Sequence, residues 1–313
     1  MSVTSRIKST TASPTVAPLL PRGSLIYSAA VITKRFGGYR SNLLALERVY
    51  GHRREGAPIF YGSGANYIAH NYFADSLTPE QVLRQHTLFG FYALGLSKSV
   101  EAEWARELKV GASLHATQYK RTSVSEMGTG GLKWCLDCAR SDHSEVGFSA
   151  WRVIHQLPFI QSCPAHGVPL IASCENCNKP LDAGDQFRLP GDSCPACGSE
   201  KFTSLPVTAN KGHLSLVLKC EEAFLARSDK FRPIAWAARM KKFLDSFESP
   251  RTALKQLSSM ICAKWEVQSP EEVSAILSFP LGKYYVQSSL AGHATKIPLV
   301  AQVIVLDAME YTN

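Results

Sequence analysis

Eight residues of metal-binding type stand in four short pairs in the middle of the 313-residue chain. Each pair has two residues between its members, a spacing that lets one tight turn offer two ligands to a single ion. Four such pairs supply the ligands of two tetrahedral sites. The pattern therefore predicts two structural Zn²⁺ ions, bound by Cys135, Cys138, Cys163, His166, Cys174, Cys177, Cys194 and Cys197.

Other roles for these cysteines fit the pattern less well. Cysteines placed for packing have no reason to repeat at this spacing. A disulfide framework has no use for His166, no secretory segment opens the sequence, and a cytosolic setting keeps thiols reduced. A catalytic zinc would need an open coordination position, which full sets of four ligands do not leave.

The ligands divide most simply in chain order. The first two pairs would then form a Cys₃His site, and the last two a Cys₄ site with the gap of a zinc ribbon. Asn178 and Gly198 directly follow the last two pairs and tolerate positive φ, so each of these pairs is expected to form a self-contained turn. We favour chain order, and the alternative that spacing leaves open is an interleaved arrangement of first pair with third and second with fourth.

Composition is that of a folded protein. Hydrophobic residues make up 45% of the chain and aromatic residues 10%, enough for two or three domains with their own cores. The longest apolar stretches, such as Ile297 to Leu306, fall short of a membrane span, and no targeting presequence is evident. We therefore expect a cytoplasmic protein without a membrane partner.

Positive charge is concentrated near the N-terminus. Residues 1–54 contain nine Lys or Arg and a single acid, Glu47, so this segment alone carries a net charge of +8. Such a surface attracts a phosphate backbone or an acidic partner. The plainer interpretation is a solubilising face on a helical domain.

The chain divides into a leader and three folded parts. Residues 1–20, rich in Ser, Thr and Pro, are expected to form a flexible leader. Residues 21–128 are expected to form an N-terminal helical domain, whose first two helices meet at Gly37–Gly38 in a helix-turn-helix-like arrangement. Residues 129–205 carry the tandem zinc ribbons, and residues 206–313 form a C-terminal helical domain. The predicted fold class is mainly α with small β zinc ribbons.

Start signals and apolar periodicity locate further helices. Pro79–Glu80 begins one helix, and Val100 to Ala116 predicts another. Ala150 to Leu157 predicts a short amphipathic helix that packs against the first zinc site. Five helices are expected in the C-terminal domain, over Leu214–Ala226, Pro233–Phe247, Thr252–Trp265, Pro270–Phe279 and Ile297–Met309.

The sequence lacks the residue patterns of a phosphoryl-transfer, cysteine-dependent or ATP-hydrolysing active site. The acids nearest the zinc ligands sit in turns among thiolates and do not form a carboxylate set for two hard cations; they are Asp137, Asp142, Glu145 and Glu175. Cys220 and Cys262 lie in apolar helical patterns, which favours structural burial over nucleophilic catalysis. No Walker-type phosphate loop is present. We therefore expect no enzyme activity.

Several single residues have a structural or a functional interpretation. Trp151 is expected in the core. Arg152 and His155 could contact phosphate, or could orient the zinc ligands beside them. His143 is a spare ligand candidate, and His86 is expected to satisfy a helix end rather than bind metal.

Several strings of the sequence together resemble the TniQ/TnsD family of transposition target-site selectors. They are Cys135-Leu-Asp-Cys138, Trp151-Arg-Val-Ile-His-Gln-Leu157, Cys163-Pro-Ala-His-Gly-Val-Pro-Leu170 and Cys174-Glu-Asn-Cys177. The segment from His86 to Tyr92 is also similar to the family's N-terminal domain. The resemblance covers about residues 21–205, and the C-terminal part matches only loosely.

The resemblance implies a protein that marks the insertion site and recruits an AAA+ ATPase, which in turn brings the transposase. Some members of the family read a fixed DNA attachment site, whereas smaller members in CRISPR-associated transposons dock on an RNA-guided effector complex. The family fold has an N-terminal helix-turn-helix-type domain followed by zinc ribbons. Direct readers are usually longer, so the length of 313 residues favours the RNA-guided adaptor.

The resulting hypothesis is a non-catalytic target-selection adaptor. Its expected partners are a TnsC-like AAA+ transposition ATPase, a CRISPR effector complex with guide RNA or target DNA, and the DNA backbone. A second copy of the chain, in a homodimer, is a further possible partner. The alternatives are a TnsD-like, sequence-specific DNA-binding selector and a zinc-ribbon interaction module outside transposition. We expect the ATPase on the basic N-terminal domain, and contacts with partner or nucleic acid at Lys34, Arg35, Arg40, Arg53, Arg54 and Arg152.

Overall fold

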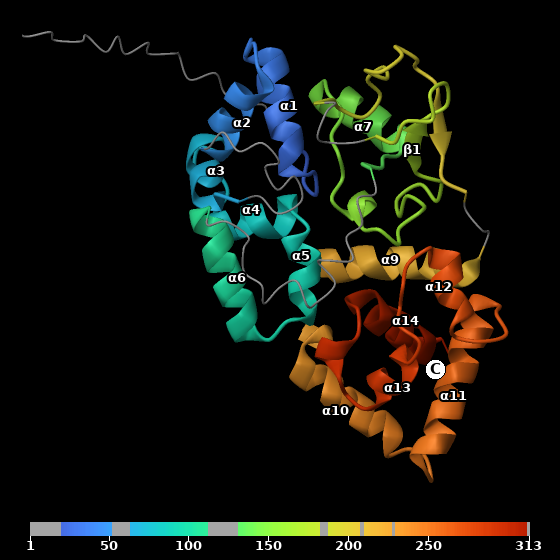
Figure 1. Cartoon of the computed structure of the whole chain (residues 1–313). Coiled ribbons are helices and arrows are strands. Elements are labelled where there is room, and N and C mark those ends of the chain that lie inside the picture. Colours follow the sequence, from blue (N-terminus) through green and yellow to red (C-terminus); the bar gives the residue numbers. More distant parts are fainter. Residues whose placement is uncertain are drawn as a thin grey trace, which may run out of the picture.

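The computed structural model describes residues 20–51, 63–111, 131–181, 187–206, 210–226 and 229–311. These residues form three groups of elements (Figure 1): N-terminal helices, a zinc-ligand region with a small sheet, and C-terminal helices. The fold is therefore mainly α with a small amount of β structure, as predicted. Among the described helices, none has both the length and the apolar character needed to cross a membrane.

The N-terminal group begins with the predicted pair of helices. α1 (Ile26–Phe36) and α2 (Asn42–Tyr50) pack against each other across a turn in which Gly38 has a φ of +67°. The other α-helices that the structure describes in this group are α3 (Ala65–Asn71), α4 (Pro79–His86), α5 (Phe89–Tyr92) and α6 (Lys98–Val110). α6 ends at Val110, because Gly111 adopts φ +78° and its N–H bonds to Glu107 O. The rest of the predicted helix, up to Ala116, lies outside the described residues.

The described residues of the zinc-ligand region include one α-helix, α7 (Leu136–Val146), and two short strands. β1 (Ile171–Cys174) pairs antiparallel with β2 (Phe202–Ser204), with Cys174 opposite Phe202. The helix predicted over Ala150 to Leu157 is wrong. Only a 3₁₀ turn, η3 (Ile154–Gln156), forms there, because the backbone of Trp151 and Val153 pairs with Leu25 and Gly23 of the N-terminal group.

The described residues of the C-terminal group contain all five predicted helices, with ends shifted by a few residues, and one further α-helix. They are α9 (Lys211–Ala226), α10 (Pro233–Leu244), α11 (Pro250–Trp265), α12 (Glu272–Leu277), α13 (Tyr285–Leu290), which was not predicted, and α14 (Leu299–Glu310). Every residue from Leu299 to Ala308 is buried, so α14 is the central helix of this group.

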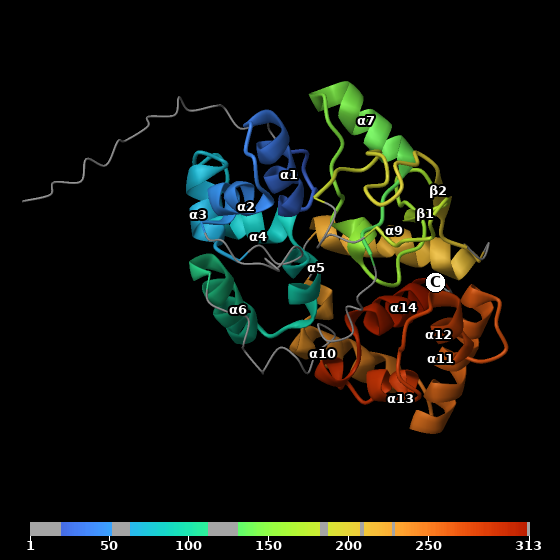
Figure 2. The same cartoon turned by 45° about the horizontal axis from the view of Figure 1, so that its top comes forward.

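Contacts between the groups join them into one hydrophobic core. α9 runs between the zinc-ligand region and the C-terminal helices in both views (Figures 1 and 2), and it contacts α5, η3, α11 and α14. The ring of Phe159 lies 6.0 Å from that of Phe91 and 5.5 Å from that of Phe279, which connects all three groups. The predicted domain boundaries stay predictions, and the buried core is continuous across them.

Candidate metal centres

The eight predicted ligands form two tetrads in chain order. Cys135, Cys138, Cys163 and His166 make the first tetrad, and Cys174, Cys177, Cys194 and Cys197 make the second. Within each tetrad, the ligand atoms all lie within 4.8 Å of one another. This grouping is the chain-order arrangement rather than the interleaved one.

The distances within the tetrads fit a tetrahedral zinc ion. Zn–S and Zn–N bonds of about 2.3 and 2.0 Å imply S···S and S···N separations of roughly 3.8 and 3.5 Å in a tetrahedron. In the first tetrad, His166 Nδ1 lies 3.4–3.5 Å from the Sγ atoms of its three cysteines. In the second, the Cys174–Cys197 and Cys177–Cys194 Sγ pairs are 3.6 and 3.7 Å apart. The two tetrads therefore fit two structural zinc ions.

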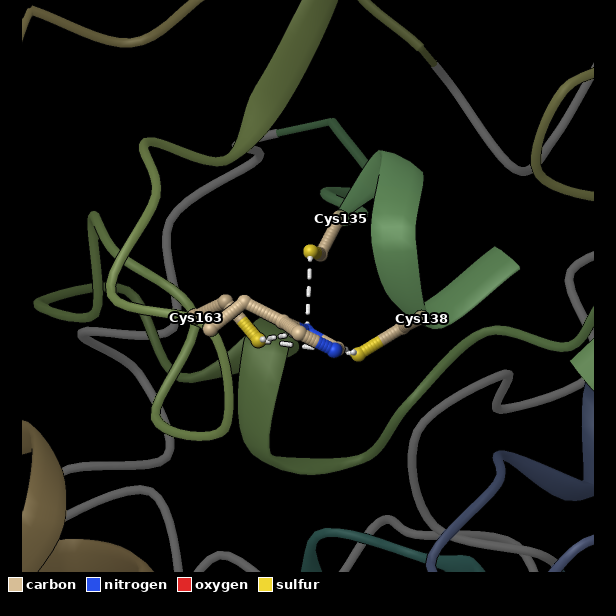
Figure 3. A group of neighbouring side chains, drawn as sticks. Cys135, Cys138 and Cys163 are labelled. Atoms are coloured by element: carbon tan, nitrogen blue, oxygen red, sulfur yellow. Dashed lines mark hydrogen bonds between the residues drawn. The ribbon is translucent and has the colours of Figure 1, made fainter. Parts of the chain in front are cut away.

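Disulfides do not account for this geometry. A disulfide bond would bring two sulfur atoms to about 2.05 Å. All nine cysteines lie within the described residues, and all are unbridged. Figure 3 shows Cys135 and Cys138 projecting from the start of α7 toward the same space as Cys163.

Three of the four ligand pairs each lie in a turn of the same type. In the pairs that begin at Cys163, Cys174 and Cys194, the first cysteine's N–H bonds to the carbonyl five residues on. Its own carbonyl accepts the N–H of the residue four positions on, at 2.7–3.0 Å. Those residues are Gly167, Asn178 and Gly198, with φ of +68°, +53° and +72°. The positive φ predicted after the last two pairs is thus confirmed.

The first pair is built differently from the predicted tight turn. Cys135 is the N-cap of α7 and Cys138 lies in its first turn, so both ligands come from the start of a helix. The residue four positions after Cys135 is Ala139, which does not favour positive φ, and its N–H continues the helical pattern to Cys135 O at 3.0 Å.

Lys133 and Gln156 hold the two halves of the first tetrad together. Gln156 accepts a hydrogen bond from Lys133 N–H and donates one to Lys133 O, at 3.0 and 2.8 Å. Lys133 Nζ donates to Leu157 O and Ile160 O at 2.6 and 2.7 Å. These bonds align the segment before Cys135 with the segment before Cys163. Burial lowers the pKa of the Lys133 amine to about 7.

Each tetrad contains a thiol that loses its proton easily. Hydrogen bonds from Cys138 and then Cys163 lower the pKa of Cys135. A hydrogen bond from the Asn176 side chain, followed by one from the Ser199 backbone, lowers the pKa of Cys197 to about 6. The hydrogen bonds with Cys135 raise the pKa of Cys138 and of Cys163, so Cys135 is the thiol of the first tetrad that loses its proton first. Thiolate is the form that binds metal.

Lys34 and Arg35 have partners inside the chain. Lys34 Nζ donates to Asn42 Oδ1 at 2.5 Å and lies 5.4 Å from the centre of the Phe187 ring. Arg35 Nη2 donates to Asp192 Oδ2 at 2.5 Å, which ties the end of α1 to the loop before Cys194. Both cations therefore support the packing of α1, whatever they contact outside the chain.

Arg152 also forms internal contacts. One terminal nitrogen donates to Arg22 O at 3.0 Å, and the other pairs with Asp142, whose side chain is only 1% exposed. This places Arg152 as a link between α7 and the N-terminal group, and its contact with nucleic acid stays a prediction. The remaining predicted cations are Arg40, which is exposed, and Arg53 and Arg54, which lie outside the described residues.

The other residues considered from sequence occupy structural positions. Trp151 is completely buried, as predicted, and its Nε1 donates to Arg188 O at 2.7 Å. His86 is buried and its Nδ1 bonds to Ser24 O at 2.8 Å, which leaves it outside both tetrads. Burial lowers the pKa of His155 to about 3. His143 is exposed on α7 and belongs to neither tetrad.

Cys220 and the acids near the zinc ligands do not form a reactive group. Cys220 is completely buried, which raises the pKa of its thiol. Asp137 pairs with Arg140 at 3.5 Å, and Glu145 accepts a hydrogen bond from Ser141 at 2.9 Å. Within the described residues, the two tetrads are the groups of three or more His, Cys, Asp or Glu side chains that converge on a metal-sized space.

The comparison with known families gives a match inside this region. The TniQ family model matches residues 28–170, from α1 to the residue before β1, and this match includes every ligand of the first tetrad. The match supports membership of the TniQ family, as the sequence resemblance indicated. The search of curated proteins gives no match.

Proposed function

We propose that this TniQ-family protein is a non-catalytic adaptor that links an RNA-guided CRISPR effector complex to a TnsC-like AAA+ ATPase. The TniQ match over residues 28–170 indicates a protein of transposition target selection, and the family acts as accessory rather than catalytic protein. The finer assignment rests on one surface feature at the N-terminal end of the molecule.

That feature is the α1–α2 corner, formed by Phe36, Arg40, Leu43, Leu44 and Arg48. Phe36 is 60% exposed, and Leu43 and Leu44 are 36% and 38% exposed. Arg40, in the turn between α1 and α2, and Arg48, one helical turn after Leu44, are also exposed and form no ion pair within the described part of the chain. Exposed aromatic and leucine side chains next to unpaired guanidinium groups suit a protein partner with acidic residues. A DNA backbone would use the cations but gain little from the apolar side chains.

Two of the cations predicted to recruit the ATPase have partners inside the chain. Lys34 and Arg35 already hold Asn42 and Asp192, so a variant at either position would disturb the packing of α1 as well as any partner. Arg40 and Arg48 carry no such internal contact in the described residues. We therefore assign recruitment mainly to the α1–α2 corner, and docking on the effector complex to the zinc-ligand region and the C-terminal helices.

A charge-reversal variant tests this assignment. Arg40→Glu/Arg48→Glu should reduce binding of the purified ATPase on DNA by at least about tenfold, because both steering and contact charges change sign. Zinc content, circular dichroism and binding to the effector complex should stay as in the unmodified protein. The matched control is Arg251→Glu/Lys255→Glu, which makes the same charge change at exposed positions of α11 and should recruit the ATPase normally. Normal recruitment by the corner variant would overturn the assignment.

The alternative function, direct reading of an attachment site, makes a different prediction. A direct reader should keep a preference for one duplex at raised salt, because base contacts are screened less than phosphate contacts. An adaptor should bind DNA weakly, with a steep loss of affinity as salt rises. A salt-resistant preference for a single duplex by the purified chain would replace the adaptor assignment with the TnsD-like one.

A further inference from the structure

Arg188 is a buried cation beside the second tetrad. Only 4% of its surface is exposed. Its Nη2 donates to Asp192 O, whereas its Nε and Nη1 are buried without a hydrogen-bond partner in the described protein. An unpaired buried guanidinium is costly, so its position requires a compensating negative group nearby.

Three contacts hold Arg188 in place, two of them with segments that carry cysteines of the second tetrad. Its guanidinium carbon lies 5.0 Å from the centre of the Phe202 ring, and Phe202 is the strand partner of Cys174. Its backbone carbonyl accepts the N–H of the buried Trp151 ring at 2.7 Å. Its Nη2 bonds to the carbonyl of Asp192, two residues before Cys194. The side chain is thus held between the strand of Cys174 and the loop of Cys194.

The nearby carboxylate does not account for the charge of Arg188 by itself. Asp192 Oδ2 already accepts hydrogen bonds from Arg35 Nη2 and Leu189 N–H, at 2.5 and 2.7 Å. Burial lowers the pKa of Arg188, and the negative charges of Asp192, Cys194 and Cys174 oppose that effect. Arginine keeps its proton under all ordinary conditions, so a full positive charge remains next to the thiolates.

A zinc ion with four thiolates carries a net charge of −2, whereas three thiolates and a neutral imidazole leave −1. The second tetrad therefore has the greater need for a buried cation and for N–H groups directed at its sulfur atoms. We propose that Arg188 is the positioning residue of the second zinc site, where its guanidinium neutralises part of the four-thiolate charge and fixes the loop that carries Cys194.

Zinc affinity of the second site tests this role in the full-length protein. Arg188→Met keeps the bulk of the side chain against Phe202 but removes the charge, and Arg188→Lys keeps the charge without the planar fork. Competition with a chromophoric chelator measures zinc affinity, and ¹¹³Cd NMR of cadmium-loaded protein resolves the four-thiolate signal from the three-thiolate one. The control is Arg140→Met, at a 70% exposed arginine of α7 beside the first tetrad.

We expect Arg188→Met to weaken the second site about 10–100-fold, the usual effect of removing a group that supports metal ligands. Arg188→Lys should restore much of this loss and shift only the four-thiolate ¹¹³Cd signal, and Arg140→Met should change neither site. Wild-type affinity in Arg188→Met would overturn the proposal. Equal loss in the Met and Lys variants would also overturn it, because the hydrogen-bonding geometry of the guanidinium and not its charge would then be the cause. If Arg188→Met does not fold, the affinity of Arg188→Lys relative to the unmodified protein decides between these outcomes.

Discussion

Cys174→Ser should abolish the second zinc site and unfold its immediate surroundings while leaving the rest of the protein folded. Cys174 is completely buried and belongs to both the tetrad and β1, so its replacement removes a ligand at the centre of the small sheet. β1 has four residues and β2 has three, and a pair of strands this short does not hold together alone.

The structure gives the size of the effect. Among the described segments that carry the second tetrad, the well-buried apolar side chains include Leu181 and Leu189, each 1% exposed, together with the partly buried Phe202. Burial of three such side chains contributes at most about 9 kcal/mol, since a fully buried one contributes about 1.5–3 kcal/mol. A structural zinc ion contributes about 10–16 kcal/mol at neutral pH, so the metal dominates local folding.

Zinc content and hydrogen exchange measure the outcome together. Elemental analysis should find about two zinc ions in the unmodified protein and about one in Cys174→Ser. Exchange followed by mass spectrometry should show loss of protection in peptides covering residues 171–181 and 187–204, with α1, α4 and α14 still protected. The first tetrad should survive, because Trp134, Trp151, Leu157 and Ile160 are buried around the segments that carry it.

Two results would refute this reasoning. Retention of both zinc ions by Cys174→Ser would mean that Cys174 is not a required ligand. Loss of both ions together with global unfolding would mean that the second site supports the whole fold and not only its own loops.

The remaining predictions concern stability and activity. Burial lowers the pKa of His86 to about 4, so the unfolded state binds a proton more tightly than the folded state does. The stability that comes from keeping His86 neutral is complete above about pH 6.5 and is lost as pH falls toward 4. The gap corresponds to about 3 kcal/mol, and His86→Asn, which keeps a donor for Ser24 O, should show a flatter loss in urea titrations between pH 7.5 and 4.5. Glu101 is a buried carboxylate that pairs with Arg84 and Arg232, and Glu101→Gln should lower the free energy of unfolding by about 3 kcal/mol in urea; a loss below about 1 kcal/mol would contradict the role of this cluster. The purified chain should neither nick DNA nor hydrolyse ATP, and metal-dependent nicking by a preparation free of transposase would contradict the non-catalytic assignment.

Local sequence determined those parts of the structure whose hydrogen bonds join residues only a few positions apart. The turns at Cys174 and Cys194 need a residue of positive φ four positions after the first ligand, and Asn178 and Gly198 supply it. The start of α4 follows the same rule, since Thr78 and Gln81 form a capping box around Pro79. The five predicted C-terminal helices also follow from periodicity and start signals.

Tertiary structure decided what depends on residues far apart in the chain. The amphipathic segment from Ala150 to Leu157 has helical spacing, yet hydrogen bonds with Gly23 and Leu25 hold part of it extended, because long-range pairing outweighs a weak local preference. The same limit applies to charge. The sequence identified Arg35 and the ligands as candidates. Their contacts depend on the fold, which brings Arg35 to Asp192, 157 positions away, and Arg188 to the strand of Cys174. A turn is determined by a few neighbouring residues, whereas the environment of a charged side chain depends on the residues that the fold packs around it.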